Sequence, residues 1–293
     1  MIALTAVGTL GGLTLLLTTA LLLAHRRFHV EEDPRIDDVE AMLPGNNCGA
    51  CGQPGCRAFA EALVSGEAAP AACTVALDAE RAEIAAFLGV DVGSAERLVA
   101  RLACAGGSNV ARLRARYQGP PTCAEAALVA GGGKACAWGC LGFGDCVTAC
   151  DFEAIRLDGH DLPVVAEDLC TACGDCVTAC PKDLFSLQRA DDHLWVRCRN
   201  ENAVDELLEA CTVACTACAR CAMDAPAGTV TMAGGLPVLD TAALRRASEA
   251  AARAAIERCP TGAIVWITDA GDEIRGRAAR PVVRRSVRPA AAS

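Results

Sequence analysis

The sequence predicts an α+β protein that is assembled from several small units rather than around one large hydrophobic core. Twenty of its 293 residues are cysteine, most of them in short-spaced runs, and aromatic residues make up only 3%. The N-terminus begins with a long stretch that carries no charged side chain. Small units with few large apolar residues are often held together by metal binding, because a preformed site rarely exists in the unfolded chain. The length allows two or three such units.

The uncharged stretch runs from Ile2 to Ala24 and consists mostly of Leu, Ala, Val, Thr and Gly. At about 1.5 Å per residue, a helix of this length can cross the roughly 30 Å hydrocarbon core of a bilayer. His25, Arg26 and Arg27 follow directly, which by the positive-inside rule puts the rest of the chain in the cytoplasm. We expect residues 1–24 to be a single-pass anchor in the inner (cytoplasmic) membrane. A cleaved signal peptide is the alternative, but the stretch lacks a basic start and an A-x-A site.

Residues 25–93 are expected to form a small unit around one metal centre. Short helices are predicted from Ala58 to Val64 and from Ala79 to Leu88. The glycines near the first cysteines predict a tight loop that can wrap a [4Fe–4S] cluster, with zinc as the rival because the spacing is not that of a ferredoxin. The four candidate ligands are Cys48, Cys51, Cys56 and Cys73.

Residues 94–190 carry two cysteine runs in tandem. The second run reads C-x2-C-x2-C-x3-C-P, the spacing of bacterial ferredoxins, in which the fourth Cys of each run ligates the other cluster. The sequence therefore predicts a two-cluster ferredoxin-like domain. In the first run Phe143 stands where the middle cysteine belongs, and Cys136 is the candidate to replace it. The predicted ligand sets are Cys150, Cys170, Cys173 and Cys176 for one cluster, and Cys136, Cys140, Cys146 and Cys180 for the other.

Structural zinc is the alternative for these runs, because repeated C-x2-C pairs also bind zinc. The tandem arrangement and Pro181, which follows the last cysteine, favour the ferredoxin interpretation.

Residues 191–270 repeat the cysteine spacing of the preceding domain. The intervals x12, x3 and x5 that begin at Cys123 recur in the same order from Cys198, which indicates a duplicated ferredoxin-like unit. The second copy lacks one complete ligand set, since ferredoxin spacing puts those ligands at Ala225, Glu249, Ala252 and Ala255. We expect a helix over the vacant site, between Thr241 and Arg258. The ligands that remain are Cys215, Cys218, Cys221 and Cys259.

Four clusters would use sixteen of the twenty cysteines. The four others are Cys104, Cys123, Cys198 and Cys211. Buried thiols are the simpler interpretation for Cys198 and Cys211, whereas an extra centre or substitute ligands stay open for Cys104 and Cys123.

Several segments resemble one known family. They read RRFHVEEDP and LPGNNCGACGQPGCRAFAEA near the membrane stretch, and VARLACAGG, YQGPPTCAEAA and CAWGCLGFGDCVTACDFEAI further on. They resemble the B subunit of the Rnf/Rsx electron-transport complex in its longer form, over roughly residues 20–265. The resemblance implies a membrane-bound, cytoplasm-facing iron–sulfur carrier, with about four [4Fe–4S] clusters by the count above. Longer members resemble a unit with both clusters in the C-terminal part, so the missing set is a departure.

The resemblance also implies partners: the other membrane and flavin subunits of such a complex, and a soluble ferredoxin as electron donor. In that family, electrons pass between reduced ferredoxin and NAD while the complex moves Na⁺ or H⁺. The flavin and nicotinamide sites are expected in other subunits, since no G-x-G-x-x-G motif follows a strand here.

Other features exclude some functions. The net charge of −9 argues against nucleic acid as a partner. No residue pattern indicates acid–base catalysis, so no catalytic residue is assigned and the question of an enzyme activity of its own stays open. The basic tail, residues 271–293, is expected to be disordered. Two alternatives remain: an anchored polyferredoxin that serves another reductase, and a zinc-stapled scaffold.

Overall fold

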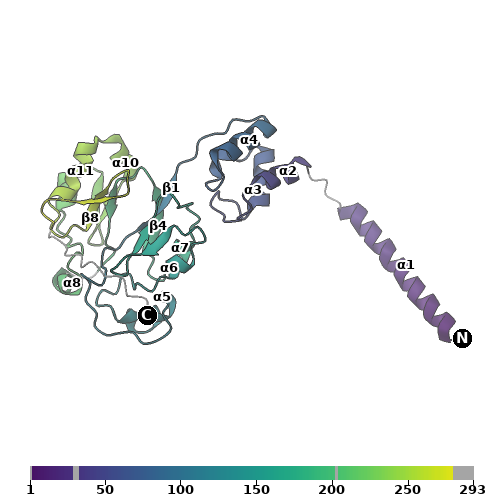
Figure 1. The fold of residues 1–293 in the computed structure, drawn as a ribbon, viewed down its shortest axis with the longest axis horizontal. Coiled ribbons are helices and arrows are strands. Elements are labelled where there is room, and N and C mark those ends of the chain that lie inside the picture. The colour runs from purple at the N-terminus through teal and green to yellow at the C-terminus, as the bar shows by residue number, and fades with distance from the viewer. Residues whose placement is uncertain (1, 29–32, 202–203, 280–293) are drawn as a thin grey trace, which may run out of the picture. The chain divides into compact units, whose positions relative to one another are not determined.

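The computed structural model describes residues 2–28, 33–201 and 204–279, with some side chains at the edges of these ranges excepted. The chain divides into two compact units (Figure 1). The first comprises Met1–Asn47, Gln53–Pro70 and Ala76–Val92, and the second Cys48–Gly52, Ala71–Val75 and Gly93–Ser293. The mixed α and β content and the N-terminal apolar helix are confirmed.

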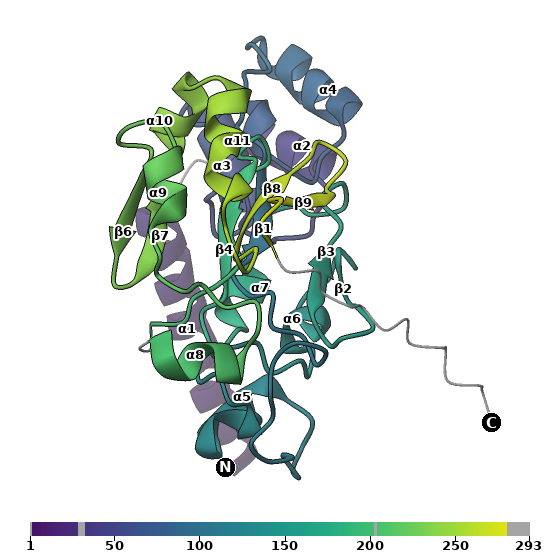
Figure 2. The ribbon, with the colours of Figure 1, turned by 90° about the vertical axis from the view of Figure 1, so that its left-hand side faces the viewer.

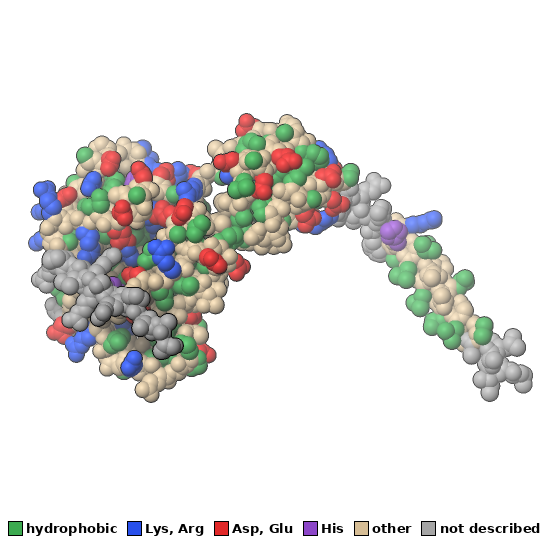
Figure 3. Space-filling model, viewed as in Figure 1, with side chains coloured by type: hydrophobic (Ala, Val, Ile, Leu, Met, Phe, Trp, Pro, Cys, Tyr) green, Lys and Arg blue, Asp and Glu red, His purple; other side chains and the backbone are tan. Residues whose placement is uncertain are grey.

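The helix α1 (Ile2–Phe28) is long and apolar enough to cross a membrane. Its leucines from Leu10 to Leu23 are exposed, and hydrophobic side chains line the visible face of the helix (Figure 3). The hydroxyls of Thr14, Thr18 and Thr19 each donate to the carbonyl four residues earlier, at 2.7–2.8 Å. Polar groups that are satisfied within the helix can be exposed to hydrocarbon at lower cost, which suits α1 to a bilayer.

The rest of the first unit is helical. Its helices are α2 (Arg35–Met42), α3 (Cys56–Ser65) and α4 (Asp78–Leu88). Phe59 and Ile84 are fully buried and form its core. Gly66 and Gly89 end α3 and α4 in the left-handed conformation that glycine adopts without steric cost. The two helices that the sequence predicts here are confirmed, with slightly wider bounds.

The second unit consists of two halves that follow one another along the chain. The first half contains β1 (Leu98–Leu102), α5 (Cys123–Leu128), η2 (Ala130–Gly133), α6 (Asp145–Thr148), β2 (Ile155–Leu157), β3 (Pro163–Val165), α7 (Asp175–Thr178) and β4 (Phe185–Arg189), after η1 (Pro70–Ala72), which spans both units. The second contains β5 (Leu194–Val196), α8 (Val204–Ala210), α9 (Arg220–Asp224), β6 (Val230–Ala233), β7 (Leu236–Leu239), α10 (Thr241–Arg246), α11 (Glu249–Glu257), β8 (Ile264–Ile267) and β9 (Glu273–Arg275).

The two halves share one strand arrangement. In the first half β1 pairs antiparallel with β4, and β2 pairs with β3. In the second half β5 pairs antiparallel with β8, and β6 pairs with β7. The match extends to single hydrogen bonds: Ala103 N–H donates to the carbonyl of Leu184 at 2.8 Å, and Arg197 N–H donates to that of Ala263 at 2.7 Å. Figure 2 shows β1 beside β4, and β8 beside β9.

Each half has its own core. In the first half Leu102, Leu184 and Phe185 are buried together with cysteine side chains. In the second half Ala255 and Ile256 of α11 are fully buried beside cysteines and the strands β6 and β8.

The helix expected from Thr241 to Arg258 is present as two shorter helices, α10 and α11. The chain breaks between them because Ser248 is extended, and its hydroxyl accepts the N–H of Ala251 at 3.4 Å as the cap of α11.

The region beyond residue 270 contains regular structure in its described part. β9 extends the sheet as the neighbour of β8, and Arg277 forms an ion pair with Glu257 of α11 at 2.8 Å. The folded part therefore reaches further than the predicted boundary at 270. Residues 280–293 of the expected disordered tail lie outside the described residues.

We predict that Ile256→Ala destabilises the second unit by about 2–5 kcal/mol, because it removes a fully buried side chain and leaves a cavity in the core. The measurement is the thermal unfolding midpoint of the anaerobically purified protein. Val238→Ala is the matched control, since that side chain is 49% exposed and its loss should change stability by about 0.5 kcal/mol or less. Equal shifts for the two variants would contradict the assignment of α11 to the core.

Candidate metal centres

Three cysteine loops of the second unit share one backbone shape. Residues two and four positions after the first Cys of each run are left-handed, a conformation that occurs in the backbone nests that bind anionic groups. These residues are Gly142 and Gly144, Ala172 and Gly174, and Ala217 and Ala219, with φ between 51° and 91°. An alanine in this conformation costs about 1–2 kcal/mol, so the loop shape is maintained against local preference.

A further left-handed residue follows the last cysteine of each run. It stands three positions after Cys150, Cys180 and Cys259. A left-handed residue also stands three positions after Ala225, which occupies the place of such a cysteine. The four left-handed residues are Glu153, Asp183, Gly228 and Gly262. The backbone at Ala225 therefore keeps the form of a ferredoxin run although the thiol is absent.

The predicted fourth ligand, Cys150, lies near the cysteines of the following run. Burial raises the pKa of Cys176 to about 12, and neighbouring thiols add to the rise. Those thiols belong to Cys170, Cys173, Cys146 and Cys150. The N–H of Ala100, from β1, donates to the sulfur of Cys170 at 3.4 Å. Cys146, which the sequence assigns to the other cluster, is among these neighbours, so the cross-ligation by Cys150 stays a prediction.

The C-terminal half brings its four candidate ligands together. Burial raises the pKa of Cys215 to about 11, and the thiols of Cys221, Cys259 and Cys218 add to the rise. Cys218 is the exposed member of the set. Ala252 and Ala255 occupy two of the vacant ligand positions and are buried in the same core as Cys221 and Cys259.

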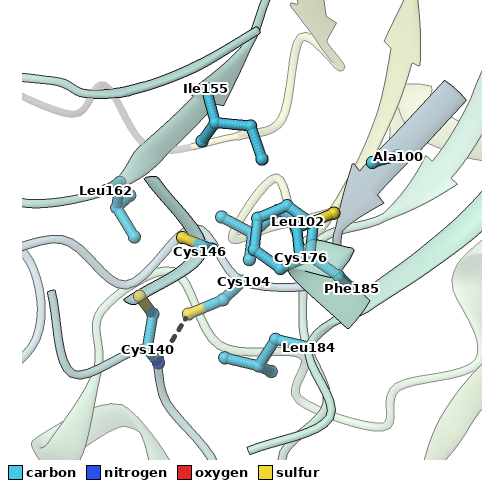
Figure 4. Close-up of a cluster of buried hydrophobic side chains, with 10 residues drawn as sticks. All are labelled: Ala100, Leu102, Cys104, Cys140, Cys146, Ile155, Leu162, Cys176, Leu184 and Phe185. Atoms are coloured by element: carbon cyan, nitrogen blue, oxygen red, sulfur yellow. Dashed lines mark hydrogen bonds between the residues drawn. The ribbon is translucent and has the colours of Figure 1, made fainter. Parts of the chain in front are cut away.

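The remaining predicted set, which contains Cys136, is divided in the structure. One small cavity is lined by Cys123 together with Cys140, Cys146 and Cys180. Cys136 lines a different cavity. Figure 4 shows Cys140 and Cys146 near each other, with the sulfur of Cys104 directed at the backbone nitrogen of Cys140. The sequence reasoning did not assign Cys123 to this group.

The first cysteine loop is organised by an asparagine. Asn47 Oδ1 accepts the N–H of Cys56 at 2.7 Å, at the start of α3. Gly55 permits this bond because a Cβ there would lie 2.9 Å from the same oxygen. Gly49 and Gly52 are left-handed, with φ of 71° and 83°. Cys48, Cys51, Cys56 and Cys73 are all half-buried.

The chemistry of these residues fits iron–sulfur clusters. Buried thiols resist ionisation, and a cationic metal core offsets that cost by binding the thiolate. Backbone N–H groups that point at cysteine sulfur, such as that of Leu184 toward Cys180 at 3.4 Å, tune the potentials of such clusters. Among the described residues no three His, Cys, Asp or Glu side chains are gathered so as to hold a single metal ion.

Two regions of the chain match known families of iron–sulfur domains. Residues 43–75 match the model of a putative Fe–S cluster family, and residues 135–185 match that of a 4Fe-4S dicluster domain. Over 273 residues the chain is 36% identical to the B subunit of the proton-translocating ferredoxin:NAD(+) oxidoreductase complex of Clostridium ljungdahlii, and the match covers 93% of each chain. The chain belongs to the B-subunit family of the ion-translocating (Rnf) oxidoreductase complexes. It is thus an iron–sulfur component of a membrane complex, as the resemblance implies.

Two further members support the assignment. The B subunit of the ion-translocating oxidoreductase complex of Methanosarcina acetivorans is 35% identical over 235 residues, which cover 80% of this chain and 89% of that protein. The B subunit of the Na(+)-translocating ferredoxin:NAD(+) oxidoreductase complex of Acetobacterium woodii is 40% identical over 209 residues. That match covers 71% of this chain and 63% of the Acetobacterium protein, less than two thirds of its length.

We predict that removal of iron unfolds the second unit, because its cysteine loops lose the metal core that offsets the burial of their thiols. Treatment with chelator under mild oxidation should reduce the circular dichroism signal and expose the second unit to trypsin. Anaerobic reconstitution with iron, sulfide and thiol should restore both signals. An iron-free protein with an unchanged spectrum and unchanged protease resistance would contradict this.

Proposed function

We propose that this chain is the electron-relay subunit of a membrane-bound ferredoxin:NAD oxidoreductase complex coupled to ion translocation. The observation that carries the proposal is the left-handed cysteine loop, which occurs three times in a chain whose relatives are B subunits of such complexes. The coupling ion is left open, because the name of one relative says Na⁺ and that of another says proton.

The proposed ligands belong to two ferredoxin-like domains and to the cysteine loop of residues 25–93. One set is Cys48, Cys51, Cys56 and Cys73. A second is Cys150, Cys170, Cys173 and Cys176, and a third is Cys215, Cys218, Cys221 and Cys259. A fourth contains Cys140, Cys146 and Cys180, and its last ligand is argued in the next subsection. The vacant positions in the C-terminal domain leave that domain with one site of its own.

Each bound [4Fe–4S] cluster would accept one electron and pass it on without making or breaking a bond to substrate. The residues of this chain hold the sites at fixed spacing, exclude water from them and donate hydrogen bonds to cysteine sulfur. No side chain is assigned an acid–base role, so hydride chemistry and ion movement belong to partner subunits.

The anchor orients the protein in the membrane. The last turn of α1 carries His25, Arg26 and Arg27, so the positive-inside rule favours a single-pass topology with the remainder in the cytoplasm. A soluble ferredoxin could reach the ferredoxin-like domains from that side.

Chain order and one contact support an exit route through the first cysteine set. Thr74 follows Cys73, and its hydroxyl donates to the carbonyl of Thr171 at 2.6 Å. Thr171 stands between Cys170 and Cys173, and both threonines belong to the second unit. A direct hydrogen bond between two ligand loops favours electron transfer between their sites over a detour through solvent. We therefore propose that electrons leave the ferredoxin-like domains by way of this loop toward the membrane subunits.

We predict that Lys134→Met lowers the reduction potential of the cluster bound by Cys140, because the substitution removes a buried positive charge that stabilises the reduced state. Lys134 is 8% exposed, and its ammonium donates to the carbonyls of Gly106, at 2.5 Å, and Cys140. The measurement is a redox titration followed by EPR. Arg114→Met is the matched control: its guanidinium donates to a carbonyl as well, that of Ala135 at 3.0 Å, but its side chain is exposed. A shift for the control as large as that for Lys134 would contradict a local charge effect.

The proposal itself is tested by purifying the tagged full-length chain from its native membrane in mild detergent. We expect membrane and flavin subunits to co-purify, and the chain to contain iron, acid-labile sulfide and EPR signals of reduced [4Fe–4S] clusters. An iron-loaded chain without those subunits would overturn the complex and favour an anchored polyferredoxin. Zinc in place of iron would end the electron-transfer proposal.

A further inference from the structure

Four cysteines from distant parts of the second unit line one small cavity. Three of them, Cys104, Cys136 and Cys211, are 6–8% exposed, and Cys198 is half-buried. We propose that these four residues ligate a fifth [4Fe–4S] cluster, and that Cys123 takes the place of Cys136 beside Cys140, Cys146 and Cys180. This inference rests on the proposed electron-relay function and goes beyond it, because it adds a site and connects the two halves of the second unit.

The cavity is built from equivalent positions of the two halves. Cys104 stands two residues after the end of β1, and Cys198 stands two residues after the end of β5, the corresponding strand. The sulfur of Cys104 accepts the N–H of Cys140 at 3.5 Å, and the sulfur of Cys198 accepts the N–H of Cys215 at 3.3 Å. Cys140 and Cys215 are themselves equivalent, since each is the first cysteine of its run. The two contacts are therefore related by the duplication.

The other two cysteines complete the same symmetry. Cys136 precedes Cys140 by four residues, and Cys211 precedes Cys215 by four residues. Each half thus supplies one thiol after its first strand and one thiol just before its cysteine run. Two equivalent pairs of cysteines that line one cavity are expected for a shared metal site. Cysteines that serve only as separate core residues would not be expected to meet in this way.

The sulfurs of Cys104 and Cys211 lie on either side of a glycine. A Cβ on Gly106 would stand 3.5 Å from the sulfur of Cys104 and 3.3 Å from that of Cys211. The N–H of Gly106 donates to the sulfur of Cys104 at 3.3 Å. The backbone of Cys211 is held in position by a β-bridge to Ala111. The absence of a side chain at Gly106 therefore leaves room between two candidate ligands that are 107 residues apart in sequence.

Cys136 is turned toward this cavity by a polar contact. The amide of Asn200 donates to the sulfur of Cys136 at 3.4 Å, and Asn200 is only 4% exposed. Asn200 follows Cys198 by two residues, so this bond also crosses between the halves. A buried amide that donates to sulfur favours a thiolate over a neutral thiol. The surroundings are therefore those of a ligand rather than of an apolar core cysteine.

Cys123 has a firm position beside the first run. The carboxylate of Asp145 accepts the N–H of Cys123 at 2.6 Å and that of Ala124 at 2.9 Å, at the start of α5. Asp145 directly precedes Cys146, so this bond fixes Cys123 against the ligand loop. Phe143, at the missing cysteine position, packs edge-on against Tyr117 with ring centroids 5.6 Å apart. Cys123 can then supply the fourth thiol without help from Cys136.

The added site lies between the ferredoxin-like halves. Its ligand Cys104 contacts the backbone of Cys140, a ligand of the first half, and its ligand Cys198 contacts that of Cys215, a ligand of the second half. A reduced cluster in one half would give one electron to the fifth cluster and become oxidised. The fifth cluster would then pass this electron to a cluster in the other half and return to its oxidised state. No proton, bond or further reactant is needed for this exchange.

The test compares iron, acid-labile sulfide and EPR spin count per chain for the anaerobically purified full-length protein and its variants. With all twenty cysteines as ligands, the wild type should bind about 20 iron atoms, and Cys104→Ala and Cys211→Ala should each lose about four. Thr212→Ala is the matched control, since Thr212 is exposed beside Cys211 and should retain the full complement. Cys123→Ala should instead remove or convert the cluster of Cys140, Cys146 and Cys180.

Cys211→Asp provides a second measurement if the alanine variants fold poorly. A carboxylate in place of one thiolate should retain the iron but change the EPR signal of a single cluster. Unchanged iron content and unchanged spectra in the variants at positions 104 and 211 would overturn the fifth site, while leaving the electron-relay function intact. Zinc bound at these four residues in an otherwise iron-loaded chain would also overturn it. Iron absent from the wild type would instead refute the proposed function itself.

Discussion

The fold of the second unit depends on the burial of thiols that must act as thiolates. Burial, with a smaller contribution from neighbouring thiols, raises the pKa of Cys140, Cys146 and Cys176 to about 12 in each case, so without a metal these side chains would be neutral at physiological pH. A cationic metal core reverses that preference. The short strands of three to five residues around these sites add little core of their own. Folding and metal binding are therefore one process in this part of the chain.

The C-terminal half has apolar side chains at positions where ferredoxin spacing would put a second ligand set. The backbone around Ala225 keeps the left-handed residue that follows a ferredoxin run, at Gly228, although no thiol remains. In the same cluster of buried side chains, α11 contributes Ala255 and Ile256, which are fully buried. Alanine-rich sequence favours a helix, and apolar burial then supplies the stability that metal coordination supplies elsewhere.

Much of this could be predicted from the sequence, because short-range spacing carries the information. The helices near residues 58–64 and 79–88 and the helical region after Thr241 follow from local patterns. The residues that surround Cys123 and Cys136 could not be predicted from local sequence patterns. Both cysteines lie outside the ferredoxin run, and spacing along the chain does not specify which cavity such a residue reaches. The sequence analysis matched Cys198 with Cys123 by interval, whereas the strands β1 and β5 match it with Cys104.

That difference changes how the duplication should be interpreted. A repeat in which each copy keeps its own ligands would leave the two halves free to diverge separately. Here one hydrogen bond to sulfur crosses between the halves, from Asn200 to Cys136, and the β-bridge between Ala111 and Cys211 does so as well. A ligand set drawn equally from both copies requires both to be present and correctly docked. If the four cysteines hold a cluster as we propose, the vacant ligand set in the C-terminal half need not interrupt the relay, because the shared site would lie between the remaining sites of the two halves.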